Sequence, residues 1–176
     1  MTSNTAVTRY NSISIALHWA VAILIIGLII LGWYMGGLPR DEFRSTLYNL
    51  HKSFGAIVLG LILLRIIWRL RSVLPSQEVA HLQQVLIEFA HFGLYLLMFA
   101  VPFIALVAGS FNRGYTFFQW HWEPLFAKDP DLAHFFMDWH GWLAYALTAL
   151  VAGHILAALH HQFVVKDNIF RRIWFS

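Results

Sequence analysis

The chain has 176 residues, of which 59% are hydrophobic and only 12% are charged, about half the charged fraction of a soluble globular domain. So short a chain has too much surface for its volume to bury this much apolar area in a core, which excludes an ordinary soluble protein. The net charge of +3 comes without a basic block, which argues against a nucleic-acid partner. The absence of Cys excludes iron–sulfur clusters, disulfides and thioether-attached haem.

Four apolar stretches are long enough to cross a membrane, which takes about 20 helical residues. In chain order they cover residues 13–36, 50–70, 86–109 and 139–165. Their length and their lack of strict alternation favour helices over barrel strands. Residues 1–176 are therefore predicted to form a single all-α membrane domain, a bundle of four transmembrane helices.

The connections between these spans carry helix boundaries and an orientation signal. Asp129-Pro130-Asp131 is typical of a helix start, so the last helix is expected to begin before its apolar span. The aromatic-rich segment before it is expected at the headgroup level. Lys and Arg favour the side that holds both termini by seven to five, which predicts cytoplasmic termini. The seven are Arg9, Arg65, Arg69, Arg71, Lys166, Arg171 and Arg172, and the five are Arg40, Arg44, Lys52, Arg113 and Lys128.

Seven of the ten His residues fall inside the apolar spans, and four of these lie at two depths that suit pairing. His140 and His154 are 14 residues apart on the last span, which places them on one helix face about 21 Å apart along the axis. His18 lies near the start of the first span and His51 opens the second. The expected pairs are His18 with His154 on the inner side and His51 with His140 on the outer side. Two facing imidazoles at each level suit two haem groups with bis-His axial ligation.

A flat macrocycle beside an axial His needs a small residue about one helical turn away. Gly or Ala occupies about one position in six of this sequence, although small residues are also common where membrane helices touch. The four His of the two expected pairs are each followed, four residues later, by such a residue, and the other six are not. The small residues are Ala22, Gly55, Ala144 and Ala158.

Other metal sites fit the sequence less well. Two pairs about 20 Å apart cannot share one zinc or copper ion, and no carboxylate or thiol completes a tetrahedral shell. Glu88 and His91 form one Glu-x-x-His step, but a di-iron bundle needs two such steps and two further Glu residues. His91 is left with two interpretations, a helix-packing residue or a group that serves a quinone or a haem propionate.

The remaining polar groups near the spans have competing interpretations. Arg65 and Arg69, one turn apart, are expected either to extend towards lipid phosphates or to pair with propionates of the inner haem. Arg113 could do the same on the outer side or attract a small anion. His160 and His161 are either solvated interfacial residues or a quinone donor and proton relay. His81, His121 and His134 lie in connections and are expected to face solvent.

Several motifs give the chain a resemblance to the bacterial cytochrome b561 family over nearly its whole length. They are Ser14-Ile15-Ala16-Leu17-His18-Trp19, His51-Lys52-Ser53-Phe54-Gly55, His91 within Ala-His-Phe-Gly-Leu-Tyr, Asn112-Arg113-Gly114, Trp139-His140, and His154 followed by His160-His161 and Lys166-Asp167-Asn168. The resemblance implies a four-helix bundle in the bacterial inner membrane that holds two haem b groups on His18, His51, His140 and His154. It also implies a quinone, such as ubiquinone, near His91 and His161.

The resemblance implies electron transfer to or from the membrane quinone pool. One branch of the family is similar to a superoxide:ubiquinone oxidoreductase, and related subunits relay electrons for a partner redox protein, so the donor is either superoxide or a protein. The outer connections sum to −1, which argues against general attraction of an anion, although a local cluster of Arg44, Arg113 and Lys128 could still provide it. A non-redox alternative is a His-based metal or proton transporter.

Overall fold

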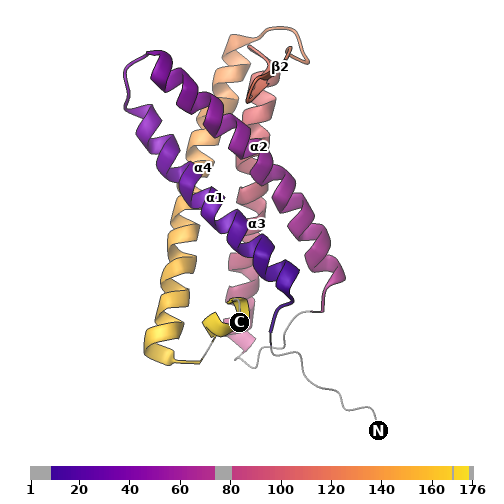
Figure 1. Ribbon diagram of the computed structural model, residues 1–176, viewed down its shortest axis with the longest axis vertical. Helices are drawn as coiled ribbons and strands as arrows, with labels where there is room; N and C mark the ends of the chain where they lie inside the picture. Colours follow the sequence, from indigo (N-terminus) through magenta and orange to yellow (C-terminus); the bar gives the residue numbers. More distant parts are fainter. Residues whose placement is uncertain (1–8, 74–80, 168, 175–176) are drawn as a thin grey trace.

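The computed structural model describes residues 9–73, 81–167 and 169–174. Its helical elements in chain order are α1 (Ser12–Gly36), α2 (Glu42–Arg71), α3 (His81–Ser110), α4 (Pro130–His160), a π-helical turn η1 (His161–Val165) and a 3₁₀ helix η2 (Ile169–Ile173). Between α3 and α4 a small antiparallel hairpin is formed by β1 (Tyr115–Phe117) and β2 (Trp120–Trp122). The long helices run along the long axis of the molecule, and the hairpin lies at one end of it (Figure 1).

Three of the long helices begin at a side-chain cap. The side chains of Asn11, Asp41 and Asp129 accept hydrogen bonds from the backbone N–H groups three residues further on. These bonds satisfy donors that the first turn of a helix leaves without a partner. At α4 the cap is followed by Pro130 at the first helical position, where a missing N–H costs nothing.

The helices pack mainly in chain order. Contacts are most extensive between α3 and α4 and between α1 and α2, followed by α2 with α3. Among the described residues, α1 packs far more sparsely on α4. The buried centre is made of aliphatic side chains from all four helices. It includes Val21, Ile25, Val58, Ile62, Leu94, Val101 and Leu147.

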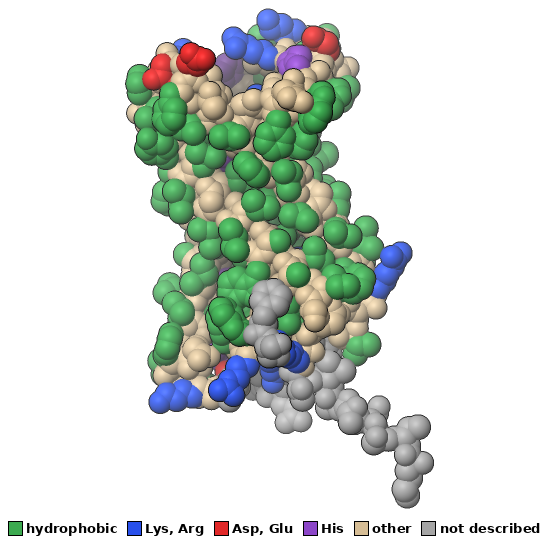
Figure 2. Space-filling view, in the orientation of Figure 1, with side chains coloured by type: hydrophobic (Ala, Val, Ile, Leu, Met, Phe, Trp, Pro, Cys, Tyr) green, Lys and Arg blue, Asp and Glu red, His purple; other side chains and the backbone are tan. Residues whose placement is uncertain are grey.

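The outer surface of the bundle is apolar. Large side chains such as Ile23, Phe89 and Leu156 are each more than 60% exposed, and hydrophobic groups cover the middle of the face seen in Figure 2, with Lys, Arg, Asp and Glu gathered towards its ends. All four long helices are long and apolar enough to cross a membrane. The prediction of an all-α, multi-pass membrane bundle is therefore confirmed.

The helices start earlier than the apolar spans of the sequence. α2 begins at Glu42, α3 at His81 and α4 at Pro130, whereas the corresponding spans were expected from residues 50, 86 and 139. The length of an apolar stretch reflects the thickness of the hydrocarbon layer. The helix can extend beyond that layer, so α2 and α4 begin earlier, at their capping residues. His81 and His134 consequently lie on helices, and both are exposed.

The two ends of the bundle differ. One end holds the hairpin and the short α1–α2 connection, and we call it the hairpin end. At the other, the terminal end, the two termini of the described chain meet, because the Tyr10 N–H donates to the Arg172 carbonyl and the Trp19 indole donates to the Ile173 carbonyl. With both termini at one end, the chain crosses the bundle an even number of times.

Candidate functional site

Two His side chains face each other at the hairpin end of the bundle. The ring centroids of His51 on α2 and His140 on α4 are 6.3 Å apart, and the rings are nearly perpendicular. The Nδ1 atom of His140 lies 2.9 Å from the Val101 carbonyl oxygen on α3. A carbonyl oxygen only accepts, so this Nδ1 carries the proton and the Nε2 of the neutral ring keeps its lone pair.

The opposite ring of this pair has an unused nitrogen. Nδ1 of His51 is buried and has no hydrogen-bond partner within the described part of the chain. Gly32 on α1 makes room for the ring, because a Cβ at that position would come within 3.3 Å of the His51 Cε1. At Gly55, one turn further along α2, a Cβ would meet nothing within 4 Å. The pair therefore has an imidazole nitrogen without a hydrogen bond, His51 Nδ1, and open space beside it at Gly55.

A second pair of rings lies at the terminal end. The ring centroids of His18 on α1 and His154 on α4 are 6.4 Å apart. Here the neighbour is a cation, because a guanidinium nitrogen of Arg65 lies 2.9 Å from the His18 Nδ1. A guanidinium only donates, so the His18 Nδ1 accepts and the ring proton resides on Nε2.

A third imidazole and a tyrosine complete this terminal-end cluster. The ring centroid of His91 on α3 is 5.8 Å from that of His154, and its Nδ1 donates to the Ile87 carbonyl over 2.7 Å. The Tyr95 hydroxyl accepts a 2.9 Å hydrogen bond from Arg65 Nε, and Arg69 lies over the Tyr95 ring at 5.9 Å. Arg65 thus contacts the pair directly, whereas Arg69 contacts Tyr95.

The spacing of both pairs suits a six-coordinate haem iron. Two imidazole–metal bonds of about 2 Å on opposite sides of one ion place the ring centroids about 6 Å apart. The described residues contain no group of three or more His, Asp or Glu side chains that could hold a metal ion. A group that needs only two axial nitrogens, as a b-type haem does, therefore fits these donors better than a bare zinc ion.

The other candidate quinone residue lies apart from these pairs. His161, the first residue of η1, has its Nδ1 2.6 Å from the Asp167 Oδ2. Its neighbour His160 is exposed, and the two rings are 6.0 Å apart. Of the two candidates, the structure thus brings His91 to the terminal-end pair and places His161 in a separate contact beyond it.

A basic pocket opens at the hairpin end. It has a volume of about 370 Å³, and none of the described residues that line it is acidic. The lining consists of Arg40, Arg44, Ser45, Tyr48, Lys52 and Arg113. Arg44 and Arg113 are therefore brought together as the sequence suggested, whereas Lys128 lies outside the lining. The Arg44 Nε is buried without a partner in the described chain, so the pocket retains hydrogen-bonding capacity for an anion.

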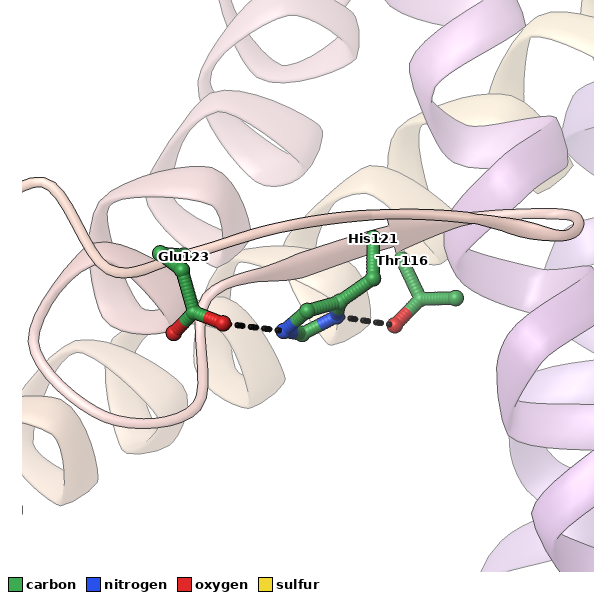
Figure 3. A network of polar contacts seen from close by, with 3 residues as sticks. All are labelled: Thr116, His121 and Glu123. Carbon is green, nitrogen blue, oxygen red and sulfur yellow. Dashed lines mark hydrogen bonds and ion pairs between the residues drawn. The ribbon is translucent and has the colours of Figure 1, made fainter.

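The hairpin itself carries a polar contact on its surface. His121 lies between Thr116, whose hydroxyl is 3.2 Å from its Nδ1, and Glu123, whose carboxylate is 3.9 Å from its Nε2 (Figure 3). All three residues belong to the hairpin or follow it directly, and the side chains of His121 and Glu123 are 47% and 88% exposed. This arrangement stabilises the hairpin locally and lies outside both His pairs.

Sequence reasoning missed three groups that shape these sites, the Val101 carbonyl, Tyr95 and Asp167. The Val101 carbonyl belongs to the backbone, so only the fold reveals that it contacts His140. Tyr95 has a signal in the sequence, because it follows His91 by four residues and must therefore share its helix face. Asp167 belongs to the Lys166-Asp167-Asn168 motif, but nothing in the residue spacing indicates that its carboxylate contacts the His161 ring.

Comparison with known proteins gives one consistent result. The model of the family described as prokaryotic cytochrome b561 matches residues 9–176. Cytochrome b561 homolog 2 of Escherichia coli strain K12 is 31% identical over 170 residues, which cover 94% of this chain and 90% of that protein. The probable superoxide oxidase CybB of Yersinia pestis is 30% identical over 173 residues, with 94% and 95% covered. Cytochrome b562 of Cereibacter sphaeroides is 27% identical over 179 residues, with 93% and 94% covered.

Proposed function

The chain belongs to the prokaryotic cytochrome b561 family, and we propose that it is a di-haem member that exchanges electrons between the hairpin side of the membrane and the quinone pool. The family makes it a membrane b-type cytochrome. The proposal of two haems per chain is supported by the two facing His pairs, whose ring separations are 6.3 and 6.4 Å. One pair alone would support a single haem.

Each pair has protein groups that would hold and orient the ligands. His51 and His140 would hold one haem, with the Val101 carbonyl fixing the orientation and proton position of His140. His18 and His154 would hold the other, and Arg65 and Arg69 are near enough to this pair to neutralise haem propionates. At the hairpin end, Arg113 is the matching candidate. A bound haem b supplies reversible one-electron exchange at each level.

We further propose that the terminal end faces the cytoplasm, in a bacterial inner membrane. The two termini of the described chain and the end of α2 lie on that side, which carries the larger share of Lys and Arg, as the positive-inside rule requires. A quinone, ubiquinone in the simplest case, would then be reduced or oxidised near the terminal-end pair. Support for this location comes from His91 beside His154 and from the family resemblance at His161.

The basic pocket favours superoxide as the electron donor. It holds four cationic side chains and no acidic one among its described lining residues, and Lys52 is the chain neighbour of His51. The chain is similar to a protein named as a probable superoxide oxidase. Superoxide would leave as dioxygen after losing one electron, and two such electrons with two protons would convert a quinone into a quinol. The net −1 charge of the hairpin side is outweighed locally, because cations cluster at the pocket.

A relay role for a partner redox protein is the second candidate. The observation that favours it is the exposed aromatic surface of the hairpin end, where Trp120, Trp122 and Phe126 are each more than half exposed. Aromatic residues are enriched at protein interfaces, although they are also typical of the membrane–water boundary.

The decisive experiment is an optical spectrum and a haem count on the purified protein, followed by a superoxide–quinone assay. The di-haem proposal expects a Soret band and two haems per chain. A His-based metal or proton transporter would show no Soret band, and one haem per chain would contradict the second site. Superoxide-dependent quinone reduction supports the oxidase. Its absence, with haem that a partner protein reduces, supports the relay.

A further inference from the structure

The end of α4 contains a backbone arrangement that the haem sites do not require. After His160 the helix widens into the π-helical turn η1, and the next residue, Lys166, has a φ of 58°. A left-handed backbone is unfavourable for a residue with a Cβ, and π-helical turns often occur at functional sites. The Lys166 N–H donates to the His161 carbonyl over 2.7 Å, which closes the turn.

This turn brings a carboxylate to an imidazole. With the chain reversed at Lys166, the Asp167 Oδ2 lies 2.6 Å from the His161 Nδ1. A carboxylate only accepts, so the Nδ1 of His161 carries a proton and its Nε2 is the nitrogen that can exchange one. The two side chains are 22% and 31% exposed, so water can reach the pair while most of each group is covered.

The position of His161 relates it to the terminal-end site. It follows His154 by seven residues, which is about 20° short of two full helical turns and about 10 Å along the axis. Because α4 remains helical through His160 and His161 keeps helical backbone angles, both side chains lie on the same face. His161 thus stands between the His18–His154 pair and the aqueous phase at the terminal end.

We propose that Asp167 is a positioning residue that holds His161 as the proton donor to a quinone reduced at the terminal end. This rests on the proposed function. Quinone reduction takes two electrons and two protons. The electrons come from one-electron donors on the hairpin side. His161 gives the proton on Nε2 to a reduced quinone oxygen and takes a replacement from the aqueous phase, which also supplies the second proton directly.

Asp167 has a defined effect in this scheme. By accepting from Nδ1, its carboxylate keeps that proton in place and compensates the charge of the doubly protonated ring. Each exchanged proton therefore arrives and leaves at Nε2, which faces away from Asp167. His160, whose ring centroid lies 6.0 Å away, is the neighbouring imidazole, and Lys166, Arg171 and Arg172 are basic residues of the adjoining turns. Among the described residues, Asp167 is the carboxylate that contacts the ring.

The test compares Asp167→Asn with Glu88→Gln in the purified holoprotein. Glu88 is an exposed α3 carboxylate that accepts a hydrogen bond from Gln84 and has no place in the scheme. We expect Asp167→Asn to lower kcat for ubiquinone reduction about tenfold and His161→Ala about 100-fold, with KM for ubiquinone and the haem spectrum unchanged. Glu88→Gln should match the wild type, and Asp167→Glu should recover part of the loss.

A double variant separates positioning from a general structural effect. Since Asp167 acts through His161, Asp167→Asn should add nothing to His161→Ala, as residues that work as a unit are not additive. Wild-type turnover in Asp167→Asn, a changed KM with unchanged kcat, or fully additive losses would each overturn the role of Asp167. A wild-type protein that contains haem but never reduces ubiquinone would instead overturn the quinone assignment, and this proposal with it.

Discussion

The two His pairs have nearly equal ring separations, 6.3 and 6.4 Å, but different neighbours. At the hairpin end, a backbone carbonyl holds the Nδ1 proton of His140 and leaves the Nε2 lone pair available. At the terminal end, Arg65 occupies the Nδ1 lone pair of His18, and the ring proton sits on Nε2, so neither nitrogen is free for a metal. Helix packing fixes the distance between two ligands, while the adjoining groups decide whether they are ready to bind.

The comparison also separates a simple site from a crowded one. At the hairpin end, the neighbours of the pair are the Val101 carbonyl and Gly32. They fix the orientation of the rings and carry no charge. At the terminal end, His91 and Arg65 contact the pair, and Tyr95 and Arg69 adjoin Arg65. Ionisable groups inside a membrane are expensive and usually functional, so exchange with a second substrate and with protons is expected at the terminal end.

The strongest test of the comparison is to remove one α4 ligand at a time. His140→Ala should abolish haem at the hairpin end and His154→Ala at the terminal end, because each change deletes one of two axial ligands. Each variant is expected to keep one haem per chain, measured by haem extraction against protein concentration. His134→Ala, an exposed change on the same helix, should retain two. If His140→Ala or His154→Ala still holds two haems, the ligand assignment is wrong.

The same variants also show whether the two sites differ in their affinity for haem. In haem-free protein, His154→Ala leaves only the hairpin-end pair and His140→Ala leaves only the terminal-end pair. His154→Ala should bind haem about tenfold more tightly than His140→Ala, which is a typical effect of groups that orient metal ligands. The reason is that Arg65 must release His18 before a metal bond can form at the terminal end. Titration with haem, followed by absorbance, gives both affinities. Equal affinities, or the opposite order, would contradict the proton positions argued above.

Much of this comparison was predictable from the sequence, and the rest depended on helix rotation. The 14-residue spacing of His140 and His154 places both on one face from helical geometry alone, and the bundle supplies a partner for each. His91 stayed ambiguous because the rotation of α3 against α4 follows from side-chain packing, which periodicity does not report. Lys128 was expected to join Arg44 and Arg113, but it is not among the described residues that line the basic pocket, and the path of a connection does not follow from residue spacing.

The basic pocket provides a smaller effect that is confined to the hairpin end. Arg113→Gln combined with Arg44→Gln should lower superoxide-driven quinone reduction several-fold, because steering of a diffusing anion depends on local positive potential. The rate of this variant should also depend less on ionic strength than that of the wild type. Lys128→Gln, outside the pocket, is the matched control. A loss as large in Lys128→Gln would show that overall charge, not the pocket, attracts the anion.

The smallest expected effect concerns the stability that a hydrogen bond from the hairpin gives to the hairpin-end site. Tyr115 on β1 donates its hydroxyl to the carbonyl of Lys52, and burial raises its pKa to about 12. Since the folded state favours the neutral phenol, this contribution is complete below the ordinary pKa of about 10 and is lost as pH rises towards 12.

Tyr115→Phe should therefore cost about 1 kcal/mol of stability at neutral pH and remove the part of the alkaline destabilisation that comes from this residue. Thermal unfolding of the holoprotein at pH 7 to 11, followed by the Soret band, measures both. Because the bond ends at the chain neighbour of His51, haem should be lost earlier from the hairpin-end site in this variant. The His140→Ala form, which has only the terminal-end pair, should lose its haem at the same temperature with or without the change, and a shift there would refute the local origin of the effect.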